Sequence, residues 1–277
     1  MHSAAGTSGR EPLAVKVPEI TFLFWVIKLL TTAGGEATSD YLSLKGDFLT
    51  GVVEVVIFVV AVWLQFRSRR YVATAYWFLA LAIAIFGTGT ADAMHLIVGI
   101  PYGGTTALWT VALAVIFWLW YRSEGTLSIH SITTRRRELY YWATVFATFA
   151  LGTALGDFTA TVVNLGYLGS AILFLVVIMI PAAAWRLGAS PVLCFWAAYV
   201  VTRPLGASFA DYFGKPHSLS GLDWGEGPVA VVLLLMIIAL VGYTAVARYD
   251  VQRPLPSAGT GSSPVPSESI GSNSRPR

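Results

Sequence analysis

Four aspartates recur at one position of a fourfold sequence pattern. In each copy, a tryptophan preceded by an aromatic residue is followed ten residues later by glycine and fifteen residues later by aspartate. The copies are Trp25–Gly35–Asp40, Trp77–Gly87–Asp92, Trp142–Gly152–Asp157 and Trp196–Gly206–Asp211. Each copy falls in an apolar stretch long enough to cross a membrane, where a carboxylate is costly and is usually functional. The aspartates are therefore the first candidates for a binding site.

One helical face joins these aspartates to other polar residues. Positions three, seven, eleven and fifteen after each tryptophan are four apart, so they line one side of a helix. This stripe carries Glu36, Thr88 and Thr153 one turn before the aspartates, and two bases, Lys28 and Arg203, deeper in the segments. If all groups are ionised, five carboxylates face two bases. A buried cluster with that imbalance needs bound protons or a bound cation.

The oxygen atoms of this stripe indicate which ligand it would take. Carboxylate and hydroxyl oxygens are hard ligands that suit Mg²⁺, Mn²⁺, Ca²⁺ or an alkali ion. We predict one site for a cation or for protons, with the candidate residues Asp40, Asp92, Asp157, Asp211, Glu36, Thr88 and Thr153. The alternative is that the aspartates merely end their helices among lipid headgroups, because a lysine soon follows Asp40 and Asp211.

Four further ionisable side chains are expected to tune this site. His95 lies one turn beyond the second aspartate and would favour Mn²⁺ or Zn²⁺ as an added metal ligand; alternatively, it is an interfacial histidine bonded to a carbonyl. Lys28, Arg203 and Glu54 are predicted to modulate the charge. Arg203 either neutralises the carboxylates while the site is empty or forms a structural ion pair with Glu36. Glu54 needs a partner inside lipid, either Lys28 or a proton.

The repeated glycines predict close helix packing. Gly35, Gly87, Gly152 and Gly206 each precede another small residue by four positions, a pattern that lets membrane helices approach closely. Packing accounts for the glycines without any further role, but it does not account for the carboxylates. It would also draw the aspartates together. Pro204 is expected to break its helix and to free carbonyl groups.

The composition excludes most soluble classes of protein. The chain has 277 residues, of which 56% are hydrophobic and 12% are charged, whereas soluble domains carry about 25% charged residues. The net charge of +3 gives no indication of nucleic-acid binding. A single cysteine excludes an intramolecular disulfide and a multi-cysteine metal site. Because no nucleophile elbow, phosphate loop, HExxH or CxxC pattern occurs, we expect neither an enzyme nor an organic cofactor.

Eight apolar segments must position the stripe, each close to the ~20 residues that span a bilayer. They cover residues 18–44, 48–66, 71–99, 104–121, 138–164, 167–186, 191–213 and 227–247, and Pro18 is expected to open the first helix. We predict an all-α polytopic membrane protein of about eight transmembrane helices, built as four parallel helical hairpins. One transmembrane domain, 16–250, would hold repeats at about 16–70, 71–124, 136–188 and 190–250. Residues 1–15 and the Ser/Pro-rich 251–277 would be disordered.

The basic residues predict the orientation of these segments. Fourteen of the 18 lie near the chain ends or in the connections on the same side, and only Lys45 and Lys215 lie in the opposite connections. By the positive-inside rule, both termini should be cytoplasmic. The four tryptophans would then form an aromatic belt at that interface. No cleavable signal peptide is expected, because residues 1–15 lack an apolar region.

The first segment resembles the opening of a bacterial membrane family built on a repeat of unknown function. The resemblance rests on the stretch from Lys16 to Thr21 and on Phe24-Trp25, Lys28, Thr31-Thr32, Gly35-Glu36 and Asp40. It covers roughly residues 16–250 and implies a multi-pass protein of the bacterial inner membrane with four hairpin repeats. Members of this family are often described only as uncharacterised or membrane-anchored proteins, so the resemblance implies no activity.

Three functions fit these observations. The first is a cation transporter, with export of a divalent metal as its more specific form. Its partners would be the lipid bilayer and the transported cation or proton. The second is a transporter of a small organic solute such as an organic cation, with aromatic walls for cation–π contacts. The third is a non-transporting scaffold or sensor, which predicts that the aspartates are scattered and individually paired. The distances among the aspartates discriminate between the transporters and the scaffold.

Overall fold

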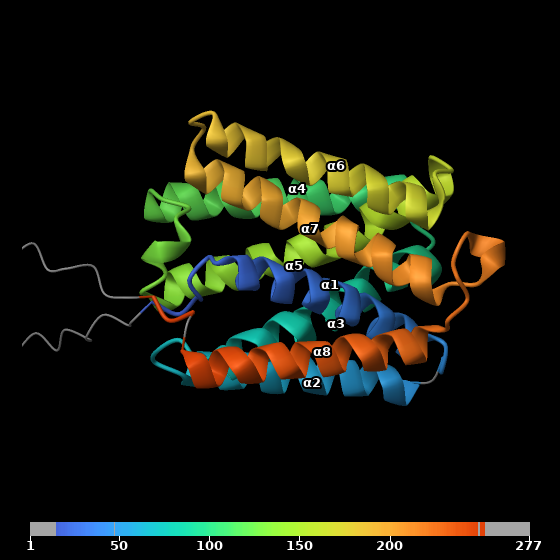
Figure 1. The fold of residues 1–277 in the computed structure, drawn as a ribbon, viewed down its shortest axis with the longest axis horizontal. Coiled ribbons are helices and arrows are strands. Elements are labelled where there is room, and N and C mark those ends of the chain that lie inside the picture. Colours follow the sequence, from blue (N-terminus) through green and yellow to red (C-terminus); the bar gives the residue numbers. More distant parts are fainter. Residues whose placement is uncertain (1–14, 47, 249, 253–277) are drawn as a thin grey trace, which may run out of the picture.

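A computed structural model describes residues 15–46, 48–248 and 250–252, and in that part of the chain it shows eight long helices and no strand (Figure 1). The helices are α1 (Phe22–Ser43), α2 (Phe48–Arg67), α3 (Ala73–Leu96), α4 (Tyr102–Glu124), α5 (Arg135–Asp157), α6 (Gly166–Arg186), α7 (Pro191–Gly214) and α8 (Glu226–Ala247). Three short helical turns, Ile129–Ser131, Phe158–Val162 and His217–Leu219, lie between them. The all-α prediction is confirmed. Most of the two segments predicted to be disordered lies outside the described residues.

Seven of the eight helices are long and apolar enough to cross a membrane. The eighth is α1, which has 22 residues but carries Lys28, Glu36 and Asp40. These three charged side chains are all buried within the protein, so α1 does not present them to lipid. The helices therefore have the lengths and composition of a polytopic membrane protein, as predicted.

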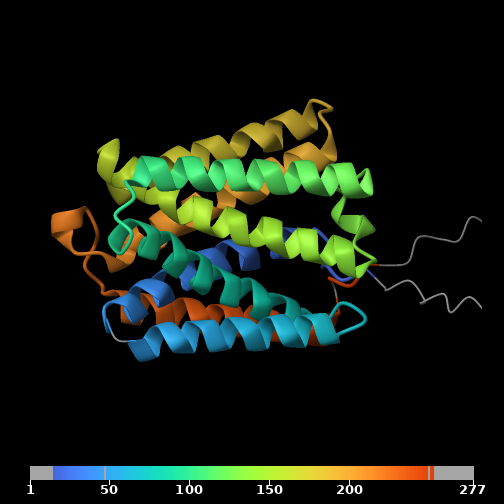
Figure 2. The same cartoon turned by 180° about the vertical axis from the view of Figure 1, so that it is seen from behind.

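The four motif helices lie between two pairs of other helices, with α4 and α6 along one edge and α2 and α8 along the opposite edge (Figures 1 and 2). The motif helices α1, α3, α5 and α7 make an inner ring in which each contacts the next, and α7 closes the ring on α1. The other four helices, α2, α4, α6 and α8, lie outside this ring and expose most of their apolar side chains. The stripe that carries the aspartates thus belongs to the inner layer.

Each outer helix packs mainly against the inner helix of the following repeat. Helix α2 packs on α3, α4 on α5, and α6 on α7, while α8 returns to α1. The two helices of one repeat, by contrast, make few contacts with each other. The repeats are therefore hairpins in sequence, but their arms are spread and interlocked with the neighbouring repeats. We call this arrangement the interlocked ring.

The four repeated glycines lie at the four crossings of the inner ring. A Cβ atom added to Gly35 would lie 2.2 Å from the Cβ of Ala84 on α3, and one on Gly206 would lie 2.5 Å from Thr32 on α1. The same construction places Gly87 against Phe149 at 3.0 Å and Gly152 against Arg203 at 2.1 Å. Every partner stands seven residues after the tryptophan of the next repeat. One contact is thus used four times around the ring.

Two prolines behave differently from the prediction. Helix α1 begins at Phe22 rather than at Pro18, because Thr21 caps it by accepting a hydrogen bond from the Phe24 amide at 3.2 Å. Helix α7 continues through Pro204 without a break. Membrane helices tolerate an internal proline when neighbouring helices support the backbone, and Gly152 of α5 packs directly against Pro204.

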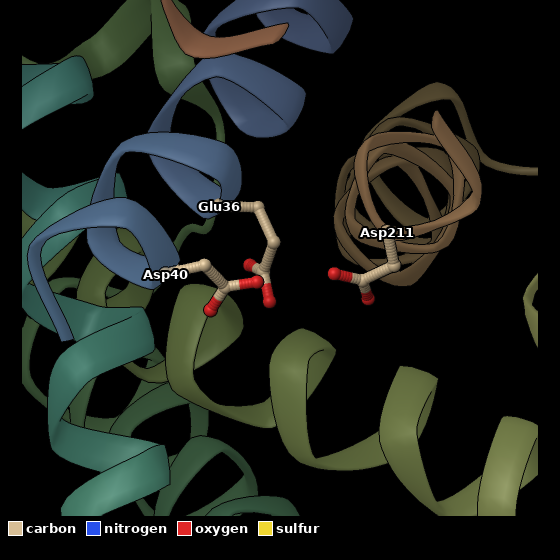
Figure 3. Close-up of side chains that lie close together, drawn as sticks. All are labelled: Glu36, Asp40 and Asp211. Carbon is tan, nitrogen blue, oxygen red and sulfur yellow. The ribbon is translucent and has the colours of Figure 1, made fainter. Parts of the chain in front are cut away.

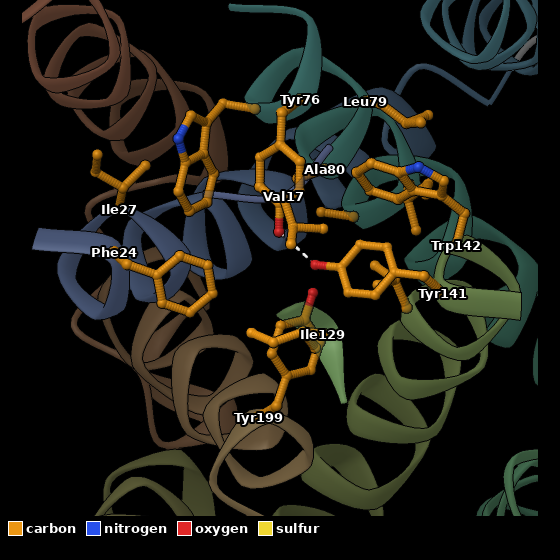
Figure 4. Close-up of a cluster of buried hydrophobic side chains, with 14 of the residues drawn as sticks. Val17, Phe24, Ile27, Tyr76, Leu79, Ala80, Ile129, Tyr141, Trp142 and Tyr199 are labelled. Carbon is orange, nitrogen blue, oxygen red and sulfur yellow. Dashed lines mark hydrogen bonds between the residues drawn. The ribbon is translucent and has the colours of Figure 1, made fainter. Parts of the chain in front are cut away.

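An aromatic core closes the ring at the end where the described chain begins and ends. Tyr76 and Tyr141 share a hydrogen bond there, and Tyr199 points its hydroxyl group toward them (Figure 4). Val17 belongs to the same buried cluster, so the segment before α1 covers the ring at this end. Three of the repeat tryptophans, Trp77, Trp142 and Trp196, are also buried. They pack inside the protein and so do not form the predicted aromatic belt, while their place at the cytoplasmic interface stays a prediction.

Candidate cation site

The stripes of the four inner helices meet along the axis of the ring. Lys28, Arg203 and Glu36 lie on this axis and are 1%, 0% and 2% exposed. They belong to α1 and α7, which are neighbours in the ring. The helical spacing of four residues therefore positions the polar side chains as the sequence indicated, and helix packing removes them from lipid.

Three carboxylates come together at the aspartate end of the axis. Glu36, Asp40 and Asp211 each contribute one carboxylate oxygen to a group in which all the oxygens lie within 4.8 Å of one another (Figure 3). Glu36 and Asp40 share one face of α1, and Asp211 approaches from α7. All three residues are buried. We call this group the acidic trio.

Glu36 links all four inner helices. Its Oε2 atom accepts hydrogen bonds from Thr88 of α3 at 2.8 Å and from Thr153 of α5 at 3.0 Å. Arg203 of α7 forms an ion pair with the same oxygen at 2.8 Å. The guanidinium group also donates to Thr88 and Thr153 and to the carbonyl oxygens of Thr32 and Phe149. The ion pair between Arg203 and Glu36 that the sequence suggested is therefore present, and it places Arg203 beside one of the carboxylates that it was predicted to neutralise.

Lys215 covers the acidic trio from outside. Its Nζ atom lies 2.5 Å from Asp40, 3.8 Å from Asp211 and 3.6 Å from Glu226. Burial by itself lowers the pKa of Lys215, but the three carboxylates outweigh this effect, and the pKa lies above its usual value of 10.5. Lys215 therefore stays charged at neutral pH and neutralises part of the trio.

Sequence reasoning missed the roles of Lys215 and Glu226. Both fall near a polar loop, where ionisable residues are usually exposed. Lys215 stands four residues after Asp211, so it continues the same helical face, and this spacing is the signal that could have identified it. Glu226 begins α8 and is only 6% exposed. Nothing in the sequence around Glu226 indicates that α8 returns to pack beside α1.

Asp92 and Asp157 lie near the trio but outside it. Both are partly exposed, and neither has an oxygen within the 4.8 Å group. Electrostatic interactions nevertheless connect Asp92 with Asp40 and connect Asp157 with Glu36. The four aspartates thus share one end of the ring, while the closest carboxylates come from the first and fourth repeats only.

His95 is not brought to the acidic trio. Its Nδ1 atom lies 2.9 Å from the carbonyl oxygen of Ile100, and its ring stacks on Tyr102 with 3.7 Å between the ring centroids. This geometry matches the interfacial histidine that the sequence left as the alternative. The expectation that His95 joins the aspartates as a ligand is not met by this arrangement.

Lys28 and Glu54 do not pair with each other. The Nζ atom of Lys28 lies 4.2 Å from the ring centroids of both Phe149 and Tyr199, and no described residue accepts a hydrogen bond from it. Glu54 lies on α2 and faces Gly89 of α3. The expected Lys28–Glu54 partnership is therefore wrong, because the side chains belong to different layers of the ring.

One buried oxygen of the trio, Asp211 Oδ1, has no hydrogen-bond donor in the described part of the chain. Asp211 is 2% exposed, and its Oδ1 atom has only the distant Lys215 ammonium group at 3.8 Å. An unsatisfied carboxylate oxygen beside two further carboxylates is a suitable ligand set for a hard cation. The residues present therefore fit a Mg²⁺ or Mn²⁺ ion.

Comparison with known proteins gives a family without a known activity. The family model described as Repeat of Unknown Function (DUF347) matches the chain four times, at residues 23–71, 75–126, 140–188 and 194–249. Each match covers one inner helix and the outer helix that follows it. No curated protein and no solved structure matches the chain. The protein belongs to the family of the Repeat of Unknown Function, as a chain that contains four copies of that repeat.

Proposed function

We propose that this protein is an integral membrane transporter of a cation, with a divalent metal such as Mn²⁺ or Mg²⁺ as the first candidate. The observation that carries the proposal is the acidic trio, in which Glu36, Asp40 and Asp211 approach within 4.8 Å of one another. The proposed cation binds these carboxylates and displaces the Lys215 ammonium group from Asp40. Asp92 and Asp157 attract cations to this end of the ring.

Arg203 supports this proposal by acting as a tethered counter-ion. Its guanidinium group forms an ion pair with Glu36, whereas Lys215 is the base paired with Asp40 and Asp211. A cation that binds the trio competes with both bases for the same oxygens. The energy of binding would therefore be coupled to the release of Arg203 or Lys215 from its carboxylate partner.

The remainder of the axis favours a carrier over an open pore. Beyond the trio, a cation meets Arg203, then Lys28, and then the buried tyrosines that close the ring. Two fixed positive charges oppose the passage of a further cation. Transport would thus require the inner helices to move against one another, and their glycine crossings are the contacts at which such movement would occur.

A second candidate is a transporter of an organic cation with an apolar part. An apolar groove of about 340 Å³ lies between α1, α7 and α8, and Ala33, Gly206 and Ala210 line it. These small residues separate the groove from the helix faces that carry the trio. The Phe149 ring already makes cation–π contacts with Lys28 and Arg203, so it is not free to bind an organic cation. The proximity of the trio carboxylates favours either transporter over a scaffold with scattered aspartates.

Metal binding by purified protein tests the proposal directly. We expect Mn²⁺, Mg²⁺ or Ca²⁺ to raise the melting temperature of the wild-type protein, because a ligand that binds only the folded state stabilises it. Asp211→Asn should abolish this increase. Asp223→Asn is the matched control, because Asp223 is exposed and its φ of 59° suits asparagine equally well.

Flux measurements complete the test. Proteoliposomes with wild-type protein should accumulate the cation that stabilises the protein, and those with Asp211→Asn should not. Stabilisation by amphipathic amines without stabilisation by metals would support the organic-cation candidate instead. If Asp211→Asn is well folded and retains both binding and flux, the proposed site is wrong.

A further inference from the structure

Glu54 is a membrane-embedded carboxylate that belongs to neither the trio nor the axis. It lies on the outer helix α2, within the segment Thr50–Arg67 that is long and apolar enough to span a membrane. Its carboxylate turns toward α3, where a Cβ atom added to Gly89 would lie 2.7 Å from Glu54 Oε2. The missing side chain of Gly89 thus makes room for the carboxylate between two helices.

No base neutralises Glu54 in the described part of the chain. Lys28 faces aromatic rings, and Arg203 is held by Glu36. Among the described residues, no charged or titratable group of the adjoining helices α1 and α3 forms an ion pair or a hydrogen bond with Glu54. These groups are Lys28, Glu36, Asp40, Tyr41, Tyr76, Asp92 and His95. A carboxylate in this position is stable when it carries a proton.

One hydroxyl group is placed to serve this carboxylate. Ser39 Oγ lies 3.4 Å from the same Cβ position at Gly89, so it faces the space that Glu54 occupies. Ser39 is completely buried, and its Oγ atom has no hydrogen-bond partner among the described residues. A protonated Glu54 is a donor, and Ser39 Oγ is an acceptor within reach of a small side-chain rotation or a bridging water.

The position is special to the first repeat. Glu54 stands twenty-nine residues after its repeat tryptophan, and the same spacing gives Thr106 in the second repeat, Ala171 in the third and Gly225, just before α8, in the fourth. The corresponding positions of these repeats therefore carry no carboxylate. Ser39 immediately precedes Asp40 of the trio, so a change at Glu54 acts on the helix that supplies two of the three carboxylates.

We propose that Glu54 is a reversible proton-binding site that couples proton movement to cation transport, with Ser39 as the acceptor for its protonated form. The coupling role rests on the proposed transport function, whereas the proton site itself does not. In the protonated state Glu54 packs neutrally against Gly89. When the proton leaves, the bare carboxylate must gain solvent or a cation, which shifts α2 relative to α1 and α3.

Chemical labelling tests the proton site independently of transport. Dicyclohexylcarbodiimide adds to a protonated carboxylic acid, whose proton passes to a carbodiimide nitrogen as the carboxyl oxygen bonds to the central carbon. We expect an adduct on the peptide that contains Glu54 in the full-length protein in nanodiscs, with the labelled fraction falling as the pH rises. Glu54→Gln should remove the adduct. Ser39→Ala should lower the pH at which half of the label is lost, because the protonated form loses its acceptor.

A second measurement tests the coupling. In proteoliposomes, Glu54→Gln should retain cation-induced stabilisation but lose the cation flux that a pH gradient drives, whereas Asp211→Asn should lose binding and keep the Glu54 label. Gly89→Ala, which displaces the carboxylate, should behave like Glu54→Gln, and Gly51→Ala is its control because nothing lies near that glycine.

The outcomes separate the two proposals. Absence of the Glu54 adduct at every pH in a folded protein overturns the proton site. Unchanged gradient-driven flux in Glu54→Gln overturns the coupling role. A wild-type protein that carries the adduct but neither binds nor moves a cation overturns the proposed transport and leaves the proton site in place.

Discussion

A single ion pair at the centre of the ring joins its four inner helices. Glu36 and Arg203 are both completely enclosed, and two threonine hydroxyls complete their hydrogen bonds. A pair of this kind contributes little net stability against an apolar replacement, but removing one partner leaves a buried charge without compensation. The pair therefore holds the inner helices together chiefly because separating Glu36 from Arg203 would leave a buried charge without a partner.

This penalty can be measured with a double-mutant cycle. We expect Glu36→Gln and Arg203→Met each to lower the free energy of unfolding by about 3–5 kcal/mol, because each strands a buried charge. The double variant should lose much less than the sum of the two. Unfolding in detergent micelles, followed by near-ultraviolet circular dichroism, provides the measurement.

The matched control for that cycle is the pair Glu124–Arg136, whose arginine lies at the surface. Its atoms are 3.5 Å apart, and the arginine side chain is 67% exposed. Because solvent screens such a pair, its coupling energy should be below about 1 kcal/mol. Equal coupling energies for the two pairs would contradict the central role assigned to Glu36 and Arg203.

Lys215 offers a second test at the scale of single residues. Lys215→Met removes a cation that competes for Asp40 and Asp211, so it should lower the stability of the metal-free protein and raise its Mn²⁺ affinity about tenfold, equivalent to ~1.4 kcal/mol. Because its pKa is raised above 10.5, Lys215 stays charged between about pH 5 and 9, and the gain in affinity should not vary over this range. Lys45→Met is the control, because Lys45 contacts the Tyr41 ring and is exposed. Calorimetric titration with Mn²⁺ measures the affinity of each variant. If Lys215→Met binds Mn²⁺ no more tightly than the wild-type protein, the trio is not the metal site.

At the scale of helices, the glycine crossings determine how closely the inner ring can pack. Gly35→Ala would place its Cβ atom 2.2 Å from that of Ala84, so we expect a loss of several kcal/mol or failure to fold. Combining it with Ala84→Gly exchanges the small and large partners and should restore much of the melting temperature. Gly51→Ala, in open space on α2, should change stability by no more than about 1 kcal/mol. A harmless Gly35→Ala would show that the crossing is loose.

The helices themselves were predictable because hydropathy and length identify membrane segments directly. The predicted segment 48–66 became Phe48–Arg67, and 191–213 became Pro191–Gly214. The pairing of the helices was not predictable, because an apolar surface does not specify its neighbour. For the same reason the burial of Trp77 could not be distinguished from a place in a lipid-facing belt.

The candidate site was predictable in part. The spacing of four residues identified the polar stripe. The Arg203–Glu36 ion pair was one of the two interpretations of Arg203 that the sequence allowed. The spacing did not determine which carboxylates come closest, because this depends on how the inner helices cross. The crossings bring carboxylate oxygens of Asp40 and Asp211 within 4.8 Å of one from Glu36, and Asp92 stays outside this group.

At the scale of the whole molecule, the two ends of the described chain are fastened together. The Glu19 amide donates to the Asp250 carbonyl oxygen at 2.8 Å, and Tyr71 donates to the Asp250 carboxylate. Nearby, Lys16 forms an ion pair with Glu138 at 2.5 Å. These contacts tie the segments before α1 and after α8 to the same end of the ring.

The Tyr71–Asp250 hydrogen bond makes a prediction about pH. Burial and this hydrogen bond raise the pKa of Tyr71 above its usual 10.0. A group whose pKa is higher in the folded state contributes its stability below the unfolded pKa, and that contribution is lost as the pH rises. The melting temperature of the wild-type protein should therefore fall more steeply above about pH 10 than that of Tyr71→Phe. Parallel curves for the two proteins would contradict a role for the hydrogen bond in stability.

The interlocked ring has a consequence for how such a protein can be assembled from pieces. The outer helix of each repeat packs on the inner helix of the next repeat, and α8 of the last repeat packs on α1 of the first. All four repeats therefore make equivalent contacts around the ring. A chain with one repeat could build the same ring as a homotetramer by exchanging helices between subunits. Likewise, a chain divided between α4 and α5 should give two co-expressed halves that exchange α4 and α8 and copurify as one complex. The ring would then not require a single continuous chain, and separate pieces would associate by exchanging their outer helices.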